Sequence, residues 1–174
     1  MVKLSRRKLR RLILTEILDK DADYYEYELA YEEVGFGDPL FEYEFFTKDG
    51  LLYLLKIEFN SSDSSIGEWS IEFDASDIPS DTFRLTGSFD LKVLSTVTQI
   101  IKDFVRRVRP RLPDPFNSVN NFTCIARQEK TPDGRPDYRR ARIYAYILRK
   151  QGIDGAEVNM NQSTGDIVMN FVIP

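Results

Sequence analysis

The residues Phe41-Glu42-Tyr43-Glu44-Phe45 alternate strictly between aromatic and acidic, and the apolar stretch Leu52–Phe59 follows them after the turn signal Lys48-Asp49-Gly50. A period of two is typical of a strand with one buried face and one wet face. Two such stretches joined by a short polar connection predict an antiparallel pair. We expect this pair to belong to an antiparallel meander.

Further strand signals lie on both sides of this pair. Tyr25–Leu29 and Glu68–Phe73 alternate in the same way, and Thr82–Thr86 is a shorter candidate. Stretches rich in Gly, Pro, Asn and Ser separate these segments, as expected for turns. Residues 24–88 therefore predict an antiparallel sheet of four to five strands, with acidic side chains on its wet face.

Helical periodicity occurs before and after this sheet. Residues 3–19 place apolar side chains on one face and basic side chains on the other, which predicts an amphipathic N-terminal helix. Residues 90–107 and 138–151 carry similar apolar stripes. A strand at 117–126 separates these two helices, and a hairpin within 156–173 follows the second one.

The predicted order is an N-terminal helix, the antiparallel sheet, and then helix, strand, helix, strand, strand. This order defines an α+β fold. At 174 residues, one domain is the expected organisation. We assign residues 1–20 to a basic amphipathic helix or leader and residues 21–174 to a single α+β domain.

Histidine is absent, and cysteine occurs once, as Cys124 in an apolar run. The missing histidine excludes Ser-His-Asp and Cys-His catalysis and zinc sites of the Cys/His type. A lone cysteine forms no internal disulfide and fits a reducing compartment, and its apolar neighbours predict an inert, buried thiol rather than a reactive one. No apolar run approaches the ~20 residues of a membrane helix, and no signal-peptide apolar region follows the basic start. We expect neither secretion nor membrane insertion.

Charge is sharply divided along the chain. Residues 1–12 carry +6, residues 13–90 carry −16, residues 91–152 carry +9 and residues 153–174 carry −3. A basic surface suits phosphates or an acidic protein partner, and arginine binds carboxylate and phosphate through two parallel hydrogen bonds. The predicted partner-binding residues are Arg106, Arg107, Arg109, Arg139, Arg140, Arg142 and Arg149.

Two other interpretations of these arginines stay open: internal pairing with the acidic sheet, and a solubilising role. Nucleic acid is a less favoured partner than protein, because the acidic half would repel a duplex. A choice also remains for Glu26, Glu28, Glu42 and Glu44, which could bind a divalent cation through oxygen ligands or form a solvated face. The solvated face is favoured, and we predict no metal site.

The segment Arg84-Leu-Thr-Gly87-Ser88-Phe89, followed by a helix from Asp90, resembles the Arg/Gln-x-x-Gly-x-Gly/Ala motif of GNAT acyltransferases. The predicted element order is also similar to the core of that family. The resemblance implies a coenzyme A thioester held by backbone N–H groups at the helix start, with Arg84, Gly87 and Ser88 as cofactor-binding residues. Phe89 departs from the small residue of the motif, and Asp90 adds a negative charge beside the anion. A GNAT-like acyltransferase, or a degenerate coenzyme-binding relative, is therefore the second hypothesis, since the same residues suit an ordinary strand-to-helix turn.

Three segments resemble parts of uncharacterised proteins of tailed bacteriophages: KLSRRKLRRLILTEIL at 3–18, residues 89–105, and Arg139–Tyr144. In T-even-like phages, head-internal proteins carry an amphipathic leader that is cut after Leu/Ile-x-Glu, and Leu14-Thr15-Glu16 is similar to that pattern. The resemblance implies an accessory or virion-associated protein of the host cytoplasm or the virion, with a phage structural protein or a host protein as partner. Because no catalytic motif is intact, a non-enzymatic binding protein without a cofactor is the favoured function.

Overall fold

The computed structural model describes residues 24–35, 37–61, 67–75, 91–126, 139–150, 153, 157–160 and 167–173. Its strands are β1 (Tyr27–Glu33), β2 (Leu40–Phe46), β3 (Leu52–Asn60), β4 (Glu68–Ala75), β5 (Asn121–Ala126), β6 (Glu157–Met160) and β7 (Ile167–Val172). They form one sheet of seven strands in the order β1-β2-β3-β4-β5-β7-β6. The described residues also contain two α-helices, so the predicted α+β class is confirmed.

Strands β1 to β4 pair antiparallel with their neighbours in sequence, as the alternating pattern predicts. The connection between β2 and β3 is the expected Lys48-Asp49-Gly50 turn, closed by a hydrogen bond from the Gly50 amide to the Thr47 carbonyl at 3.0 Å. Gly50 has φ of +78°, a conformation that a side chain would disfavour. The turn fixes the register that places Phe45 opposite Tyr53.

One pair of strands is parallel, contrary to the expectation of an antiparallel sheet. Strand β5 lies parallel to β4, with Trp69 opposite Phe122 and Ile71 opposite Cys124. A parallel neighbour requires a long crossover connection, and the chain between β4 and β5 includes the helix α2 (Leu91–Asp103). The remaining pairs, β5 with β7 and β7 with β6, are antiparallel.

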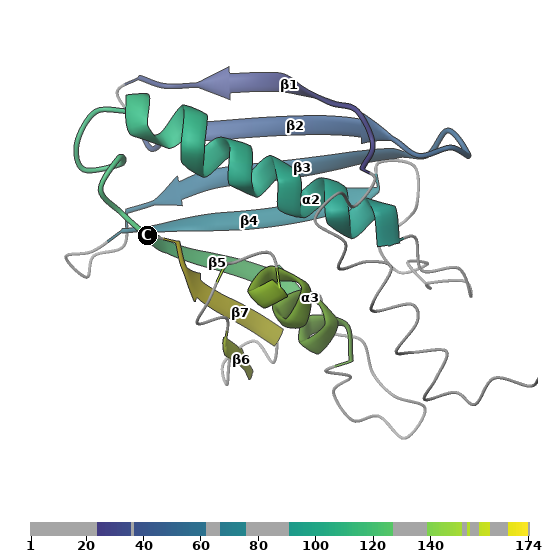
Figure 1. The fold of residues 1–174 in the computed structure, drawn as a ribbon. Coiled ribbons are helices and arrows are strands. Elements are labelled where there is room, and N and C mark those ends of the chain that lie inside the picture. The colour runs from purple at the N-terminus through teal and green to yellow at the C-terminus, as the bar shows by residue number, and fades with distance from the viewer. Residues whose placement is uncertain are drawn as a thin grey trace, which may run out of the picture.

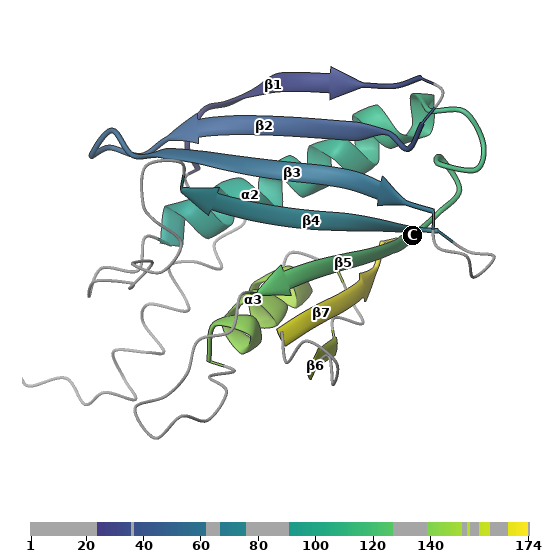
Figure 2. The same cartoon turned by 180° about the vertical axis from the view of Figure 1, so that it is seen from behind.

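Both helices cover the same face of the sheet. Helix α2 crosses β1 to β4 in front of the sheet in Figure 1, and α3 (Arg139–Lys150) lies beside β5 and β7 on that side. Figure 2 shows the reverse face, which no described helix covers. The predicted helices at 90–107 and 138–151 thus match α2 with its extension, and α3.

The C-terminal end of α2 widens before the chain leaves the helix layer. Five residues of π-helical spacing, η1 (Phe104–Val108), follow α2, and the Arg109 amide donates to the Phe104 carbonyl. A short 3₁₀ turn, η2 (Arg109–Arg111), comes next and includes Pro110, which cannot continue a helix. The apolar side of this stretch presents Phe104 and Val105 to the core.

Aromatic side chains form the centre of the core between the sheet and α2. Trp69 is fully buried, as expected for its strand, and its ring centroid lies 4.9 Å from that of Phe104. Phe104 also meets Phe41 edge-on at 5.2 Å. Edge-to-face contacts of this kind add to the stabilisation from burial alone.

Several predictions fall outside the described residues. These are the N-terminal helix at 3–19, the leader at 1–20 and the strand at Thr82–Thr86. The structure does not support the predicted GNAT-like order. Within the described part of the chain, neither helix has the length and apolar character needed to cross a membrane.

Candidate functional site

The alternation of the strands turns acidic side chains to the face of the sheet that the helices do not cover. In β2, Phe41, Tyr43 and Phe45 are buried towards the helices. Because successive side chains of a strand point to opposite faces, Glu42 and Glu44 point away from the helices. Part of the acidic block in residues 13–90 therefore becomes a spatial feature, since the described strands β2 to β4 turn their carboxylates to the uncovered face.

We call this uncovered surface the acidic sheet face. In register it aligns Glu42 with Lys56 and Lys56 with Glu72, and it places Glu28 opposite Glu44. The hydrogen bond that the protonated Glu44 carboxyl donates to Glu28 is the main cause that raises the pKa of Glu44. Lys56 binds Glu58 at 2.7 Å. The acidic members are Glu28, Glu42, Glu44, Glu58, Glu68 and Glu72.

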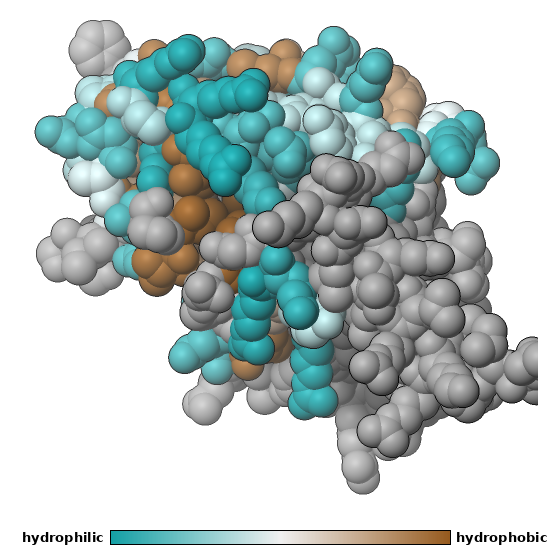
Figure 3. Space-filling view, viewed as in Figure 1, coloured by the Kyte–Doolittle hydropathy of each residue, from teal (hydrophilic) through white to brown (hydrophobic). Residues whose placement is uncertain are grey.

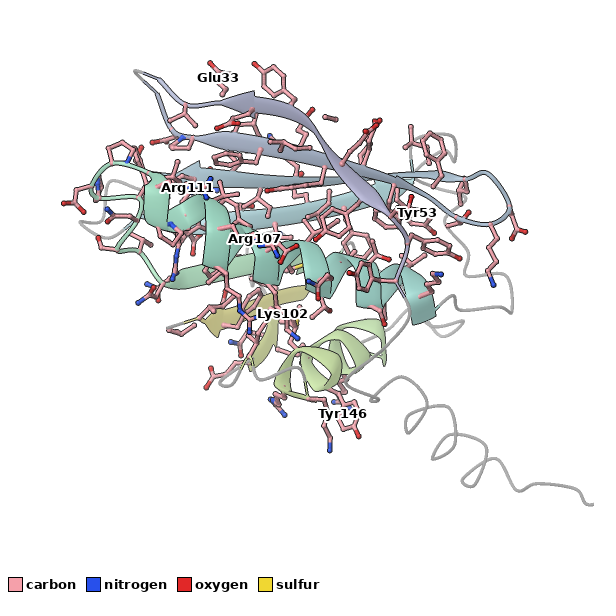
Figure 4. The ribbon with its side chains drawn as sticks, turned by 45° about the horizontal axis from the view of Figure 1, so that its top comes forward. Glu33, Tyr53, Lys102, Arg107, Arg111 and Tyr146 are labelled. Atoms are coloured by element: carbon pink, nitrogen blue, oxygen red, sulfur yellow. The ribbon has the colours of Figure 1, made fainter. Side chains whose placement is uncertain are left out.

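The helix layer presents the opposite charge. Helix α3 buries Ala145 and Leu148 towards the sheet, so its exposed residues Arg142 and Arg149 face outwards. Hydrophilic residues are visible over part of the helix layer in Figure 3, and Figure 4 shows Lys102, Arg107 and Arg111 along the helix layer, while Glu33 lies apart on β1. We define the basic helical face as Lys102, Arg106, Arg107, Arg111, Arg142, Arg149 and Lys150.

The described helical segments contain a single acidic residue, Asp103, and neighbouring side chains interact with its carboxylate. It accepts a hydrogen bond from the Tyr27 hydroxyl and lies 3.8 Å from the Arg107 guanidinium. Burial, and then the bond to Asp103, raise the pKa of Tyr27. Partial burial and the neighbouring Arg106 lower the pKa of Lys102, as expected where positive charges gather. The face therefore keeps a strongly positive character.

Arg109 does not lie on the predicted partner-binding surface. It is buried, and its Nη1 donates to the Asn120 side chain at 2.7 Å and to the carbonyls of Val119 at 3.3 Å and Ile173 at 3.2 Å. It therefore joins η2 to the start of β5 and the end of β7. Burial lowers its pKa. A guanidinium used in this way is structural, so Arg109 is excluded from the partner-binding set.

Replacing Arg109 with methionine is expected to destabilise the fold by about 1–3 kcal/mol, because the carbonyls and the amide that it bridges would lose a charged donor. Urea unfolding of the purified protein measures this change. Arg111→Met is the matched control: Arg111 is exposed two residues away, and its loss should alter stability by no more than about 0.5 kcal/mol. Equal effects of the two substitutions would contradict the anchoring role.

The other predicted site residues divide into two groups. Arg106, Arg107, Arg142 and Arg149 are exposed on the helix layer. Arg139 and Arg140 belong to the backbone of α3, but their side chains lie outside the described set, as do residues 84, 87 and 88 altogether. The sequence interpretation missed Lys102, although its spacing of four residues from Arg106 places both on one helix side.

A small apolar cavity of about 30 Å³ lies where β4 and β5 diverge. Its walls come from β4, β5, β7 and both helices, and its hydroxyl-bearing residue, Thr98, already donates to the Leu94 carbonyl at 2.8 Å. Cys124 contributes to the lining, and burial raises the pKa of its thiol to about 12. A thiol held in its protonated form is a poor nucleophile. The cavity therefore offers packing space rather than chemistry.

Among the described residues, no group of three or more Cys, Asp or Glu side chains is arranged to hold a metal ion. No protein-family model, curated protein or solved structure matches this chain. The surface charges, the burial and the geometry of the described residues are therefore the features that indicate a function.

Proposed function

We propose that this protein is a non-enzymatic accessory or virion-associated protein of a tailed bacteriophage, which binds a macromolecular partner through the basic helical face. The observation that carries the proposal is the separation of charge. The exposed arginines of η1 and α3 belong to the helix layer on one face of the sheet, while the carboxylates of β2 to β4 alternate with buried residues and so point out of the other face. A surface of this kind attracts an acidic partner and orients it on approach.

The same geometry argues against pairing of these arginines with the acidic sheet face. Acidic and basic groups that face opposite sides of a sheet are separated by the core, so the carboxylates of β2 to β4 lie out of reach of the helix layer, where Arg107 pairs locally with Asp103 at 3.8 Å. A protein partner with an acidic patch is favoured over nucleic acid, because the acidic sheet face would repel a long polyanion that wrapped around the molecule. Charge reversal of the basic helical face, argued in the Discussion, is the test.

A coenzyme A-binding or GNAT-like role is the second candidate, and one observation favours it. The ladder between β4 and β5 ends at Ile71 and Cys124, although the strands continue to Ala75 and Ala126. Two parallel strands that diverge leave backbone groups facing a gap, where an extended chain bearing amides could bind. Against this role, the adjoining cavity is apolar and Asp90 would oppose a pyrophosphate at the start of α2.

We expect no measurable binding of coenzyme A or acetyl-coenzyme A by the purified full chain. The reason is that no basic side chain among the described residues lies at the gap between β4 and β5, where it could bind the phosphates. Isothermal titration calorimetry at about 0.1 mM ligand, well above a micromolar Kd, tests this expectation. A micromolar Kd would contradict the first proposal in favour of the second. Competition by free pantetheine, which lacks the nucleotide, would then locate the ligand in the β4–β5 gap.

A further inference from the structure

We propose that the outer edge of strand β1 is a docking site for an extended, basic segment of a partner protein, which adds to the sheet as a further strand. None of the residues of the basic helical face belongs to this strand, so the inference goes beyond the proposed function, and either can fail while the other holds. The position of β1, the exposure of its side chains and the charge at the edge all favour such a ligand.

Strand β1 is an outermost strand of the sheet, and Figures 1 and 2 both show it along the upper edge. Among the described strands, β2 alone pairs with it. In an antiparallel pair, every second residue of an edge strand turns its N–H and C=O groups away from the neighbouring strand. Along the seven residues of β1, these outward groups can form hydrogen bonds with an extended segment that lies beside them.

The side chains of β1 are exposed on both sides of the sheet. Every residue of the strand after Tyr27 is exposed, and these include two large apolar side chains, Leu29 at 43% and Tyr31 at 46%. Leu29 lies opposite Tyr43, on the side that the helices cover, whereas Tyr31 lies opposite Glu42, on the uncovered side. A strand added at this edge would therefore bury apolar surface on both sides of the sheet, in addition to forming main-chain hydrogen bonds.

The charge of the edge selects a basic ligand. Strand β1 carries Glu28, Glu32 and Glu33 and no basic residue. Glu28 lies directly opposite Glu44 of β2, and the hydrogen bond between these two carboxyl groups is the main cause that raises the pKa of Glu44. Negative charge is therefore crowded at this edge. A lysine or arginine of an added strand, placed opposite Glu28, would form a favourable cross-strand pair there.

The same charge argues against a second copy of the chain as the occupant. Two copies joined through β1 would bring their glutamates together, and like charges on adjacent strands destabilise the pairing. The register shift between Leu29 and Tyr31 also bends the edge, which hinders the pairing of identical edges. The favoured occupant is a partner segment that alternates basic with apolar residues. Its basic side chains would lie on the uncovered side near Glu28, and its apolar side chains near Leu29.

Nuclear magnetic resonance titration of the isotope-labelled full chain tests the proposal, with an end-blocked heptapeptide that alternates lysine with valine as the probe. We expect the peptide to shift the β1 amide signals and to slow their hydrogen exchange. Binding should weaken at about 1 M salt, where the screening length falls to about 3 Å. A peptide with glutamate in place of lysine should not bind. Unperturbed β1 amides, equal binding of the glutamate peptide, or full protection of the β1 amides before any peptide is added would overturn the proposal.

Two methylated forms of the lysine peptide separate strand addition from attraction between charges. One form is N-methylated on its valines and the other on its lysines. Alternate residues of an extended strand turn their N–H groups to opposite edges, so only one of the two sets faces β1. We expect one form to keep the affinity of the parent peptide and the other to lose it. Equal affinities of the two forms would overturn the proposal.

Charge reversal in the protein locates the site. Glu28→Lys with Glu33→Lys is expected to weaken binding of the lysine peptide about 10-fold. The matched control is Glu157→Lys on β6, the strand at the other edge of the sheet, which should bind like the wild type. Unchanged affinity in the double variant, or an equal loss in the control, would overturn the proposal. If the double variant fails to fold, the two methylated peptides decide the question on the unmodified chain.

Discussion

Partner capture is expected to weaken about 100-fold when four exposed arginines of the basic helical face are reversed to glutamate, which corresponds to about 2.7 kcal/mol. The four substitutions are Arg106→Glu, Arg107→Glu, Arg142→Glu and Arg149→Glu. Each one replaces an attraction with a repulsion towards an acidic partner. The measurement is quantitative mass spectrometry of proteins retained from an infected-cell lysate by the immobilised chain, followed by titration with the retained protein.

The matched control reverses the same number of charges on the other side of the sheet, at Glu42, Glu44, Glu58 and Glu72. Capture by this control should match the wild type. Thermal melts come first, because exposed ion pairs contribute only about 0–1 kcal/mol each, so the arginine variant should melt close to the wild type. A large loss of stability would instead indicate that the arginines pair internally. Unchanged capture by the arginine variant would contradict the proposed function.

Phe104→Ala is expected to destabilise the fold by about 3–5 kcal/mol, a large part of the stability of an ordinary domain. Phe104 is fully buried in η1 and packs against Trp69 and Phe41, so its removal leaves a cavity in the aromatic core. Phe46→Ala is the control, since Phe46 is 56% exposed and should contribute little. Urea unfolding measures both variants. If the two variants lost comparable amounts of unfolding free energy, the core would not be organised around η1.

The sequence predicts β1 to β4 and both described helices because their signals are local. Alternation in Phe41–Phe45 depends on one buried face, and the stripe in residues 90–107 depends on one helix contact, so neighbouring residues contain the information. The parallel pairing of β5 with β4 is different. It depends on how a distant helix returns the chain to the sheet, and no residue in Asn121–Ala126 specifies the direction of its neighbour.

In the candidate site, too, some features follow from local sequence signals and others depend on long-range contacts. Exposed arginines such as Arg106 and Arg142 follow from helix periodicity, because they alternate with the apolar stripe. Arg109 could not be distinguished from them in the sequence. Its partners Asn120 and Ile173 lie 11 and 64 residues further along the chain, and only the assembled sheet brings them together. The direction of the two charged faces likewise required the sheet, since charge blocks alone do not say which way their side chains point.

Zero-length cross-linking with a carbodiimide identifies the face that contacts the partner, because this reagent joins a carboxylate to an amine only where the two are in contact. The chain is cross-linked to its captured partner, and the joined peptides are identified by mass spectrometry. If the basic helical face binds the partner, we predict links from Lys102 and Lys150 to carboxylates of the partner. Links from Glu42, Glu44 or Glu72 of the acidic sheet face to partner lysines, without links from the helix layer, would contradict it.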